Sequence, residues 1–90
     1  MKIDFDPAKD RANTEKHGCS LALAEWFEWD GAYAIPDTRF DYGEERFIAV
    51  GYIGSRLYVS VYTDRGDTRR VIGLRKANPR EDKKYAQVKT

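Results

Sequence analysis

The sequence predicts an α+β domain in which N-terminal helices pack on a small antiparallel sheet and a short helix closes the chain. Helix-start residues occur at positions 6–7 and again at position 20. Residues 46–76 contain three apolar-rich runs separated by turn residues, and residues 78–81 repeat the helix-start pattern. We expect one domain over residues 1–90, because a chain of 90 residues has room for one modest core.

The N-terminal residues predict a short strand followed by a polar helix. Residues 2–5 have the alternation of a strand. Asp6 is a favourable N-cap, and Pro7 suits the first helical position because its missing N–H has no partner to lose there. Gly18 accepts the left-handed conformation that ends many helices. We therefore expect a solvent-facing helix that begins at Pro7 and stops at Gly18.

A second helix is expected from Leu21 to about Trp29, with Ser20 as its N-cap. Most of its side chains are apolar, so it is predicted to be mostly buried. We assign its aromatic residues Trp26, Phe27 and Trp29 to the core.

The sequence favours an intracellular location. The single cysteine, Cys19, cannot form an internal disulfide, and we expect it to be a small buried residue. The first residues contain no apolar run typical of a signal peptide, and no segment approaches the ~20 apolar residues that span a membrane. A cytoplasmic protein without membrane contacts is the expectation.

The second half of the chain is typical of β structure that ends in a helix. Gly54-Ser55 predicts a two-residue hairpin turn and residues 64–67 a longer one, so the last three strands should form an antiparallel meander. Asn78, Pro79 and Glu81 predict a C-terminal helix over roughly residues 79–87. The four strands expected in this part of the chain, in addition to the one at residues 2–5, are residues 33–35, 46–53, 56–63 and 69–76.

Alternation within residues 56–63 separates two kinds of side chain. Leu57, Val59 and Val61 share one face, which we expect to pack on the helices. The opposite face is expected to be open and to lie beside arginines of the next strand. Such a face suits single-stranded RNA, because phosphates bind arginines and bases stack on aromatic rings. Its residues are Arg56, Tyr58, Ser60 and Tyr62.

Charge is unevenly divided along the chain. Residues 1–45 carry 5 basic and 11 acidic side chains, a net charge of −6, whereas residues 46–90 carry 11 basic and 4 acidic side chains, a net charge of +7. This asymmetry favours a surface for a polyanion in the second half. Charge alone does not separate RNA from DNA or from an acidic protein.

Several short motifs follow one another in a defined order along nearly the whole chain. They are Phe5-Asp6, Lys9, Asn13, Lys16-His17-Gly18, Glu44-Glu45-Arg46, Arg69-Arg70-Val71-Ile72, and Arg75-Lys76-Ala77 leading to Glu81 and Tyr85. Together they resemble the BrnT toxins. The resemblance implies a RelE-like fold and a metal-independent endoribonuclease that arrests translation. It also implies neutralisation by a BrnA-type antitoxin, whose ribbon-helix-helix region binds operator DNA, so that the toxin meets that DNA only indirectly.

Metal-independent RNA cleavage requires a base for the 2′-hydroxyl, cations for the phosphorane and an acid for the leaving 5′-oxygen. Glu45 is a candidate base if burial raises its pKa, and His17, the only histidine, is the other. Arg46 and Arg75 are the catalytic candidates for holding the phosphate. The remaining RNA-binding candidates are Lys16, Tyr58, Tyr62, Arg65, Arg69, Lys76 and Tyr85.

Structural roles stand beside these catalytic ones. His17 suits the negative end of a helix, Glu44 and Glu45 suit surface ion pairs, and Tyr85 suits packing. One histidine, one cysteine and scattered carboxylates lack metal-ligand spacing, so neither a metal nor another cofactor is expected. The competing function is a non-catalytic RNA- or protein-binding module, for example a degenerate toxin that represses its operator together with the antitoxin.

Overall fold

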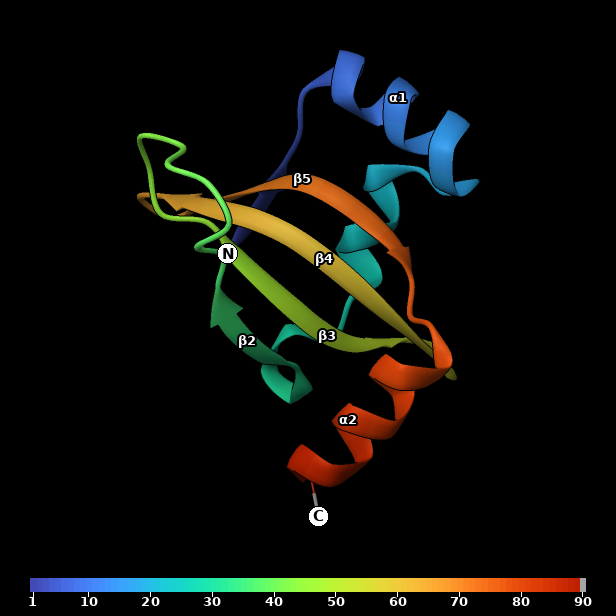
Figure 1. Cartoon of the computed structure of the whole chain (residues 1–90). Helices are drawn as coiled ribbons and strands as arrows, with labels where there is room; N and C mark the ends of the chain where they lie inside the picture. Colours follow the sequence, from blue (N-terminus) through green and yellow to red (C-terminus); the bar gives the residue numbers. More distant parts are fainter. Residues whose placement is uncertain (90) are drawn as a thin grey trace.

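The computed structural model describes residues 1–89 and confirms the α+β class. Its centre is a five-stranded sheet with the strand order β1-β5-β4-β3-β2 (Figure 1). The strands are β1 (Lys2–Asp4), β2 (Tyr33–Pro36), β3 (Phe47–Ile53), β4 (Arg56–Arg65) and β5 (Thr68–Lys76). The RelE-like assignment remains a prediction.

The sheet is mixed, so the expectation of a purely antiparallel sheet is wrong. β3, β4 and β5 form the predicted antiparallel meander, but β1 pairs with β5 in parallel, with Lys2 opposite Thr68. The meander leaves the outer edge of β5 unpaired, and β1 fills it. A parallel direction is possible because the two strands are separated by most of the chain, which gives a long crossover.

The first helix, α1 (Pro7–His17), has the predicted ends. The Asp6 carboxylate accepts a hydrogen bond from the Ala8 amide at 2.8 Å. Gly18 adopts φ 73°, and its amide donates to the Thr14 carbonyl. Local sequence therefore fixes both ends of this helix.

The predicted second helix is instead two short 3₁₀ segments, η1 (Leu21–Trp26) and η2 (Trp29–Gly31). Phe27 takes an extended conformation, with φ −68° and ψ 129°, which ends η1 and turns the Phe27 ring into the core. Phe27 is buried as predicted, and Trp29 is partly buried against the core. The core assignment of Trp26 is wrong, because this side chain is 71% exposed.

The second hairpin is tighter than expected. β4 continues to Arg65 and β5 begins at Thr68, so Gly66 and Asp67 alone form the turn, and Gly66 takes a positive φ of 63°. The predicted four-residue turn is thus a two-residue turn.

The C-terminal helix, α2 (Pro79–Lys89), begins with the predicted capping box. The Glu81 amide donates to the Asn78 side chain, and the Asn78 amide donates to the Glu81 carboxylate, both at 2.9 Å. In Figure 1, α1 and α2 lie at opposite ends of the sheet. No helix within residues 1–89 is long and apolar enough to cross a membrane.

The sheet face that carries Tyr58, Ser60 and Tyr62 is covered, so the expectation that it is open is wrong. Tyr62 is only 6% exposed and packs in one cluster with Leu21 of η1. Ser60 is fully buried, and Tyr58 packs against the same cluster. We call this side of the sheet the η1 face. The tyrosines of this face therefore do not form an open surface on which RNA bases could stack.

A β-bulge explains why the alternation in β5 misleads. The register between β4 and β5 shifts between Val61 and Tyr62. As a result Val71 and Leu74, three residues apart, both join the buried cluster on the η1 face. The bulge also separates two arginines that strict alternation would place together, because Arg69 pairs opposite Asp64 and Arg75 pairs opposite Val59.

The opposite side of the sheet, which we call the α2 face, has its own smaller core. Leu57 and Val59 are buried as predicted, but Ala77 and the Tyr85 ring of α2 pack beside them rather than the N-terminal helices. The Tyr85 hydroxyl donates to the Gly31 carbonyl at 3.1 Å, which fixes α2 to η2. The part of this face nearer α1 is not filled by α2.

Candidate functional site

A small pocket on the α2 face brings three basic side chains together. Its volume is about 120 Å³, and its basic side chains are His17 at the end of α1, Arg39 from the loop before β3, and Arg75 on β5. These segments are far apart in the sequence. The rest of the lining is Asn13, Ile48, Val59, Val61, Gly73 and Leu74. We call this hollow the basic pocket.

Asn13 connects α1 to the sheet beneath this pocket. Its side-chain amide donates to the carbonyls of Cys19 at 2.9 Å and Leu74 at 2.7 Å, while its oxygen accepts from the Leu74 amide at 3.1 Å. Cys19 is buried as predicted, and its thiol donates to the same Leu74 carbonyl. A buried amide with three satisfied hydrogen bonds holds the end of α1, and therefore His17, over β5.

Arg75 forms a two-bond ion pair with Glu81. Two guanidinium nitrogens donate to the two carboxylate oxygens at 2.7 Å each. The guanidinium holds the pKa of the Glu81 carboxyl below its usual value. Arg75 thus presents a fixed and partly neutralised cation to the pocket.

His17 has an unusual charge environment. It is exposed at the C-terminus of α1, a position where a helix favours a cation. Desolvation, followed by the positive charges of Lys16 and Arg75, nevertheless lowers the pKa of its imidazole. The neutral imidazole, which can accept a proton, is therefore favoured at neutral pH.

Arg39 is held in place by a buried carboxylate. Its Nε and Nη2 donate to the two oxygens of Asp37 at 2.8 Å each, and the Tyr42 hydroxyl donates to Asp37 at 3.1 Å. The Asp37 side chain is 1% exposed, whereas that of Arg39 is 62% exposed. Arg39 hydrogen bonds hold the pKa of Asp37 far below its usual range. The loop thus holds the Asp37 carboxylate in the interior of the protein and leaves the Arg39 guanidinium accessible to solvent.

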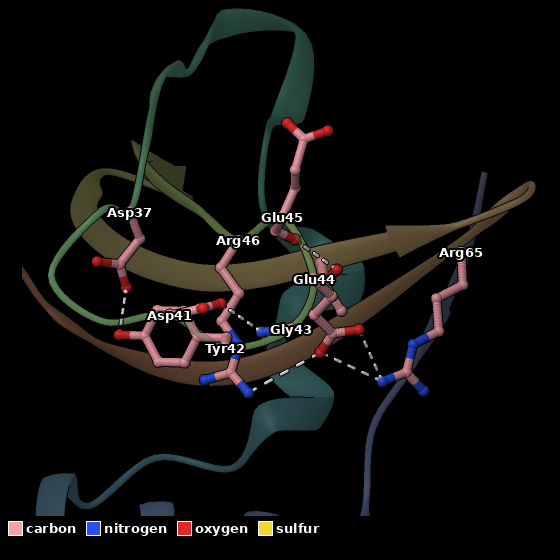
Figure 2. Close-up of polar contacts among 9 residues, drawn as sticks. Asp37, Asp41, Tyr42, Gly43, Glu44, Glu45, Arg46 and Arg65 are labelled. Carbon is pink, nitrogen blue, oxygen red and sulfur yellow. Dashed lines mark hydrogen bonds and ion pairs between the residues drawn. The ribbon is translucent and has the colours of Figure 1, made fainter.

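A second charged group lies around the end of the same loop (Figure 2). Arg46 lies over the Tyr42 ring, with its guanidinium carbon 3.9 Å from the ring centroid. Glu44 lies between two cations, 3.2 Å from Arg65 and 3.9 Å from Arg46. Figure 2 shows the Glu45 carboxylate pointing away from these residues. Arg46 and Arg65 are therefore brought together with Glu44 rather than with Glu45.

Glu45 and the basic pocket lie at different positions along the strands of the sheet. The Glu45 carbonyl accepts a hydrogen bond from the Thr63 hydroxyl, whereas Arg75 pairs opposite Val59. Thr63 and Val59 are four residues apart on β4, which corresponds to roughly 13 Å along a strand. Glu45 is also exposed, so it lacks the burial on which its assignment as a base depended.

The Arg69 side chain is held on the η1 face by hydrogen bonds and by contacts with aromatic rings. It makes two hydrogen bonds to Asp64 at 2.8 and 2.9 Å. Its guanidinium also lies over the rings of Tyr62, at 4.2 Å, and Trp29, at 4.7 Å. The Tyr62 ring in turn stacks on Phe47. This cluster joins η2 to the sheet and has the contacts of a structural element.

The remaining predicted residues are dispersed. Lys16 is exposed beside His17, and Lys76 is exposed at the end of β5, opposite Tyr58 in the sheet register. Tyr85 contacts Tyr33 and Tyr52 and so fixes α2. The structure thus brings His17, Lys16 and Arg75 together and leaves the other candidates elsewhere.

A larger hollow suits a polyanion less well. It measures about 690 Å³, lies beside η1 and η2, and its charged lining side chains are Glu25, Glu28 and Asp30 together with Arg69. Three carboxylates there repel phosphates, whereas the basic pocket attracts them. Within residues 1–89, no three histidine, cysteine or acidic side chains form a group that could hold a metal ion.

Comparison with known proteins identifies a family. Residues 5–81 match the family model described as "Ribonuclease toxin, BrnT, of type II toxin-antitoxin system". The match covers most of the chain, including His17, Arg39 and Arg75. No curated protein matches the chain.

Proposed function

Since the chain belongs to the BrnT family of ribonuclease toxins from type II toxin–antitoxin systems, we propose that it cleaves RNA internally, without a metal ion, at the basic pocket. The observation that carries this proposal is the convergence of His17, Arg39 and Arg75 on one hollow. Arginines bind phosphates through paired hydrogen bonds, and a histidine supplies a group that exchanges protons near neutral pH.

The proposed roles follow from charge and accessibility. Arg39 and Arg75 hold the scissile phosphate and stabilise the negative charge of the phosphorane. Neutral His17 takes the proton of the 2′-hydroxyl, whose oxygen then attacks phosphorus. The bond from phosphorus to the 5′-oxygen breaks, and that oxygen takes a proton from water. The proton that His17 then releases neutralises the resulting hydroxide, so that a 2′,3′-cyclic phosphate and a 5′-hydroxyl remain. Glu45, the alternative base, is exposed and lies at a different position along the sheet from Arg75, which favours His17.

Other basic residues extend the proposed RNA surface. Lys16 is exposed beside the pocket, while Lys76 and Arg65 are exposed at the two ends of the long hairpin. Lys16 is placed to contact a phosphate next to the scissile one. Lys76 and Arg65 are separated by roughly 23 Å along β4, and Lys76 lies on the η1 face with its register partner Tyr58, so these two would contact only distant parts of a bound RNA. Arg46 has a positioning role in this proposal, because it stacks on Tyr42 within the loop that carries Arg39.

The cellular part of the proposal comes from the family. We infer that RNA cleavage arrests translation in the cytoplasm and that a BrnA-type antitoxin neutralises the toxin. The antitoxin would contact the operator through a ribbon-helix-helix region, so that the toxin meets DNA only through its partner.

A non-catalytic module is the competing function. It is favoured by the pairing of Arg75 with Glu81, which gives Arg75 a sufficient structural role. A degenerate toxin of this kind would bind RNA or its antitoxin and act in operator repression. It would show salt-dependent RNA binding without cleavage products.

The decisive experiment is an RNA-cleavage assay of the purified chain in the presence of a chelator. Wild type is compared with His17→Gln, Arg39→Ala and the matched control Arg11→Ala, which removes an exposed charge on α1 outside the pocket. Cleavage is expected for wild type and the control and should fall at least about a hundredfold in the two pocket variants. Intact RNA with wild type, or equal cleavage by all four proteins, contradicts the proposal.

A further inference from the structure

A second hollow adjoins the basic pocket on the α2 face. It has a volume of about 340 Å³ and lies between α2 and the outer strands β2 and β3. Ile48 and Arg75 line both hollows. We call the second hollow the apolar groove. Its other lining residues are Tyr33, Ile35, Val50, Arg80, Glu81 and Lys84.

The floor of the apolar groove is exposed at Ile35. It is built from Tyr33 and Ile35 of β2 together with Ile48 and Val50 of β3. Ile35 is 53% exposed, although it lies opposite Ile48 in the sheet. β2 is an edge strand that pairs only with β3, so one row of its backbone groups is free to meet another chain. An aliphatic floor beside a free strand edge suits a protein segment.

The charges on the rim of the groove indicate which charge a bound protein segment should carry. Arg75, Arg80 and Lys84 contribute three positive charges and Glu81 one negative charge, a net charge of +2. Arg75 and Glu81 neutralise each other, which leaves Arg80 and Lys84, and both are exposed. Neither has an ion pair or hydrogen-bonded partner among residues 1–89. Carboxylates on the occupant would therefore meet unpaired cations at the rim.

We propose that the apolar groove binds an acidic, amphipathic segment of the antitoxin and that the bound segment closes the basic pocket. Aliphatic side chains would fill the floor between β2 and α2, and carboxylates would contact Arg80 and Lys84. This inference rests on the proposed function in one respect, namely that the basic pocket is where RNA binds.

Two other occupants fit less well. RNA would place phosphates along the rim, but three of the four floor residues are aliphatic, so that Tyr33 alone among them offers the bases a hydrogen-bonding group. A second copy of the chain would bring an identical positive rim against this one, and like charges oppose that contact. A protein segment with carboxylates and aliphatic side chains satisfies both the rim and the floor.

Occupancy of the groove would act on the pocket through Arg75. This guanidinium lies at the boundary of the two hollows, so a segment in the groove contacts it directly. Carboxylates placed there would repel an RNA phosphate and would block its approach along the α2 face. Inhibition then requires no rearrangement of His17 or Arg39.

The test uses, as the antitoxin, the purified product of the open reading frame that adjoins the gene of this chain. Its Kd is measured for wild type, Ile35→Asp and Lys84→Glu. The matched control is Lys83→Glu, which reverses an exposed charge on α2 outside the groove. Each groove variant should raise the Kd about tenfold or more, whereas the control should change it less than about twofold. Because Lys84 is exposed, its replacement should leave the fold intact, as circular dichroism would verify.

The outcomes separate this inference from the proposed function. RNA cleavage by the free variants reports the function, and antitoxin affinity reports the groove. Weakened antitoxin binding supports the inference even if no protein cleaves RNA, a result that would overturn the function alone. Unchanged antitoxin affinity in both groove variants overturns the inference. It is equally overturned if the chain alone is a dimer that Ile35→Asp converts to a monomer, since a second copy then occupies the groove.

Discussion

Arg75 and Glu81 form a two-bond ion pair that fastens the last strand to the C-terminal helix, with both N···O distances at 2.7 Å. The same carboxylate accepts the Asn78 amide at the start of α2. One side chain therefore caps the helix and partly neutralises a guanidinium of the basic pocket. The stability of α2 and the charge available to RNA are coupled through Glu81.

The first prediction separates these two roles. Glu81→Gln keeps an acceptor for the capping box but removes the charge that binds Arg75. We expect the free energy of unfolding to fall by about 1 kcal/mol, because the pair is partly exposed and screened. RNA affinity should rise several-fold as Arg75 is released. Urea unfolding and RNA binding at fixed salt measure the two effects.

Asp82→Asn is the matched control for this change. Asp82 is exposed, also lies in the first turn of α2, and has no contact with Arg75 among residues 1–89. If Glu81→Gln and Asp82→Asn strengthen RNA binding equally, the effect comes from net charge alone and the coupling through Arg75 is wrong.

The second prediction concerns the pH dependence of cleavage. Partial desolvation, Lys16 and Arg75 lower the pKa of His17, so its folded pKa lies below the ordinary value of about 6.5. A general base must be neutral, so cleavage should fall as the pH drops through this lowered pKa. Lys16→Gln removes one positive charge and should move the fall in cleavage to higher pH.

The titration can be followed directly because the chain has one histidine. A single imidazole resonance in NMR spectra should move with pH at the same midpoint as the rate. Lys83→Gln, which removes a lysine from α2 instead, should leave this midpoint in place. If Lys16→Gln shifts the midpoint of the His17 resonance but leaves the pH profile of the cleavage rate unchanged, His17 is not the general base.

Features governed by neighbouring residues were predictable from the sequence. Asp6 and Gly18 end α1, and Asn78 begins α2, because each cap depends on side chains and backbone angles within a few positions. The meander was predictable for the same reason, since Gly54 and Gly66 supply the positive φ that its turns require.

The exposed face of the sheet was not predictable, because it depends on contacts between distant residues. Alternation shows that Tyr58 and Tyr62 share a side, but it does not show which side η1 covers. The β-bulge opposite Val61 and Tyr62 then adds one residue to β5, so that the side chains before and after it do not follow one continuous alternation. Trp26 was misassigned because the expected α-helix is a 3₁₀ segment, at whose end the Trp26 side chain lies in solvent.

The site was predictable in part. His17 and Arg75 stood out as a titratable group and a strand arginine. Arg39 carried no signal, since it follows a short strand in a loop with no periodicity. The role proposed for Arg39 depends on Asp37, whose burial appears only in the folded chain. Glu45 looked suitable from its position before a strand, but the fold leaves it in solvent.

The third prediction tests the anchor under Arg39. Asp37 has a lowered pKa in the folded state, so the stability it contributes is present above its unfolded pKa of about 4 and is lost as the pH falls below that. Asp37→Asn should lower the free energy of unfolding by about 2 kcal/mol at pH 7. It should also reduce the further loss of stability that wild type shows between about pH 5 and pH 3. Urea unfolding at several pH values measures both.

Asp41→Asn serves as the comparison, because Asp41 is exposed in the same loop and accepts only the Gly43 amide among residues 1–89. It should change stability little and keep the acid dependence of wild type. Equal pH profiles for Asp37→Asn and wild type would show that Asp37 does not anchor the loop electrostatically.

The fourth prediction concerns the packing of Phe27 on the sheet. A Cβ atom on Gly51 would lie 2.8 Å from the Ala32 Cβ and 2.9 Å from the Phe27 ring, so Gly51→Ala must displace the segment that joins η1 to β2. We expect it to destabilise the fold by about 1–3 kcal/mol in urea unfolding. Gly73→Ala is the control, since its Cβ would meet Val61 at an ordinary 3.8 Å. Both glycines are in strands, and similar stability for the two variants would mean that Phe27 yields to the added methyl group and does not fix this part of the core.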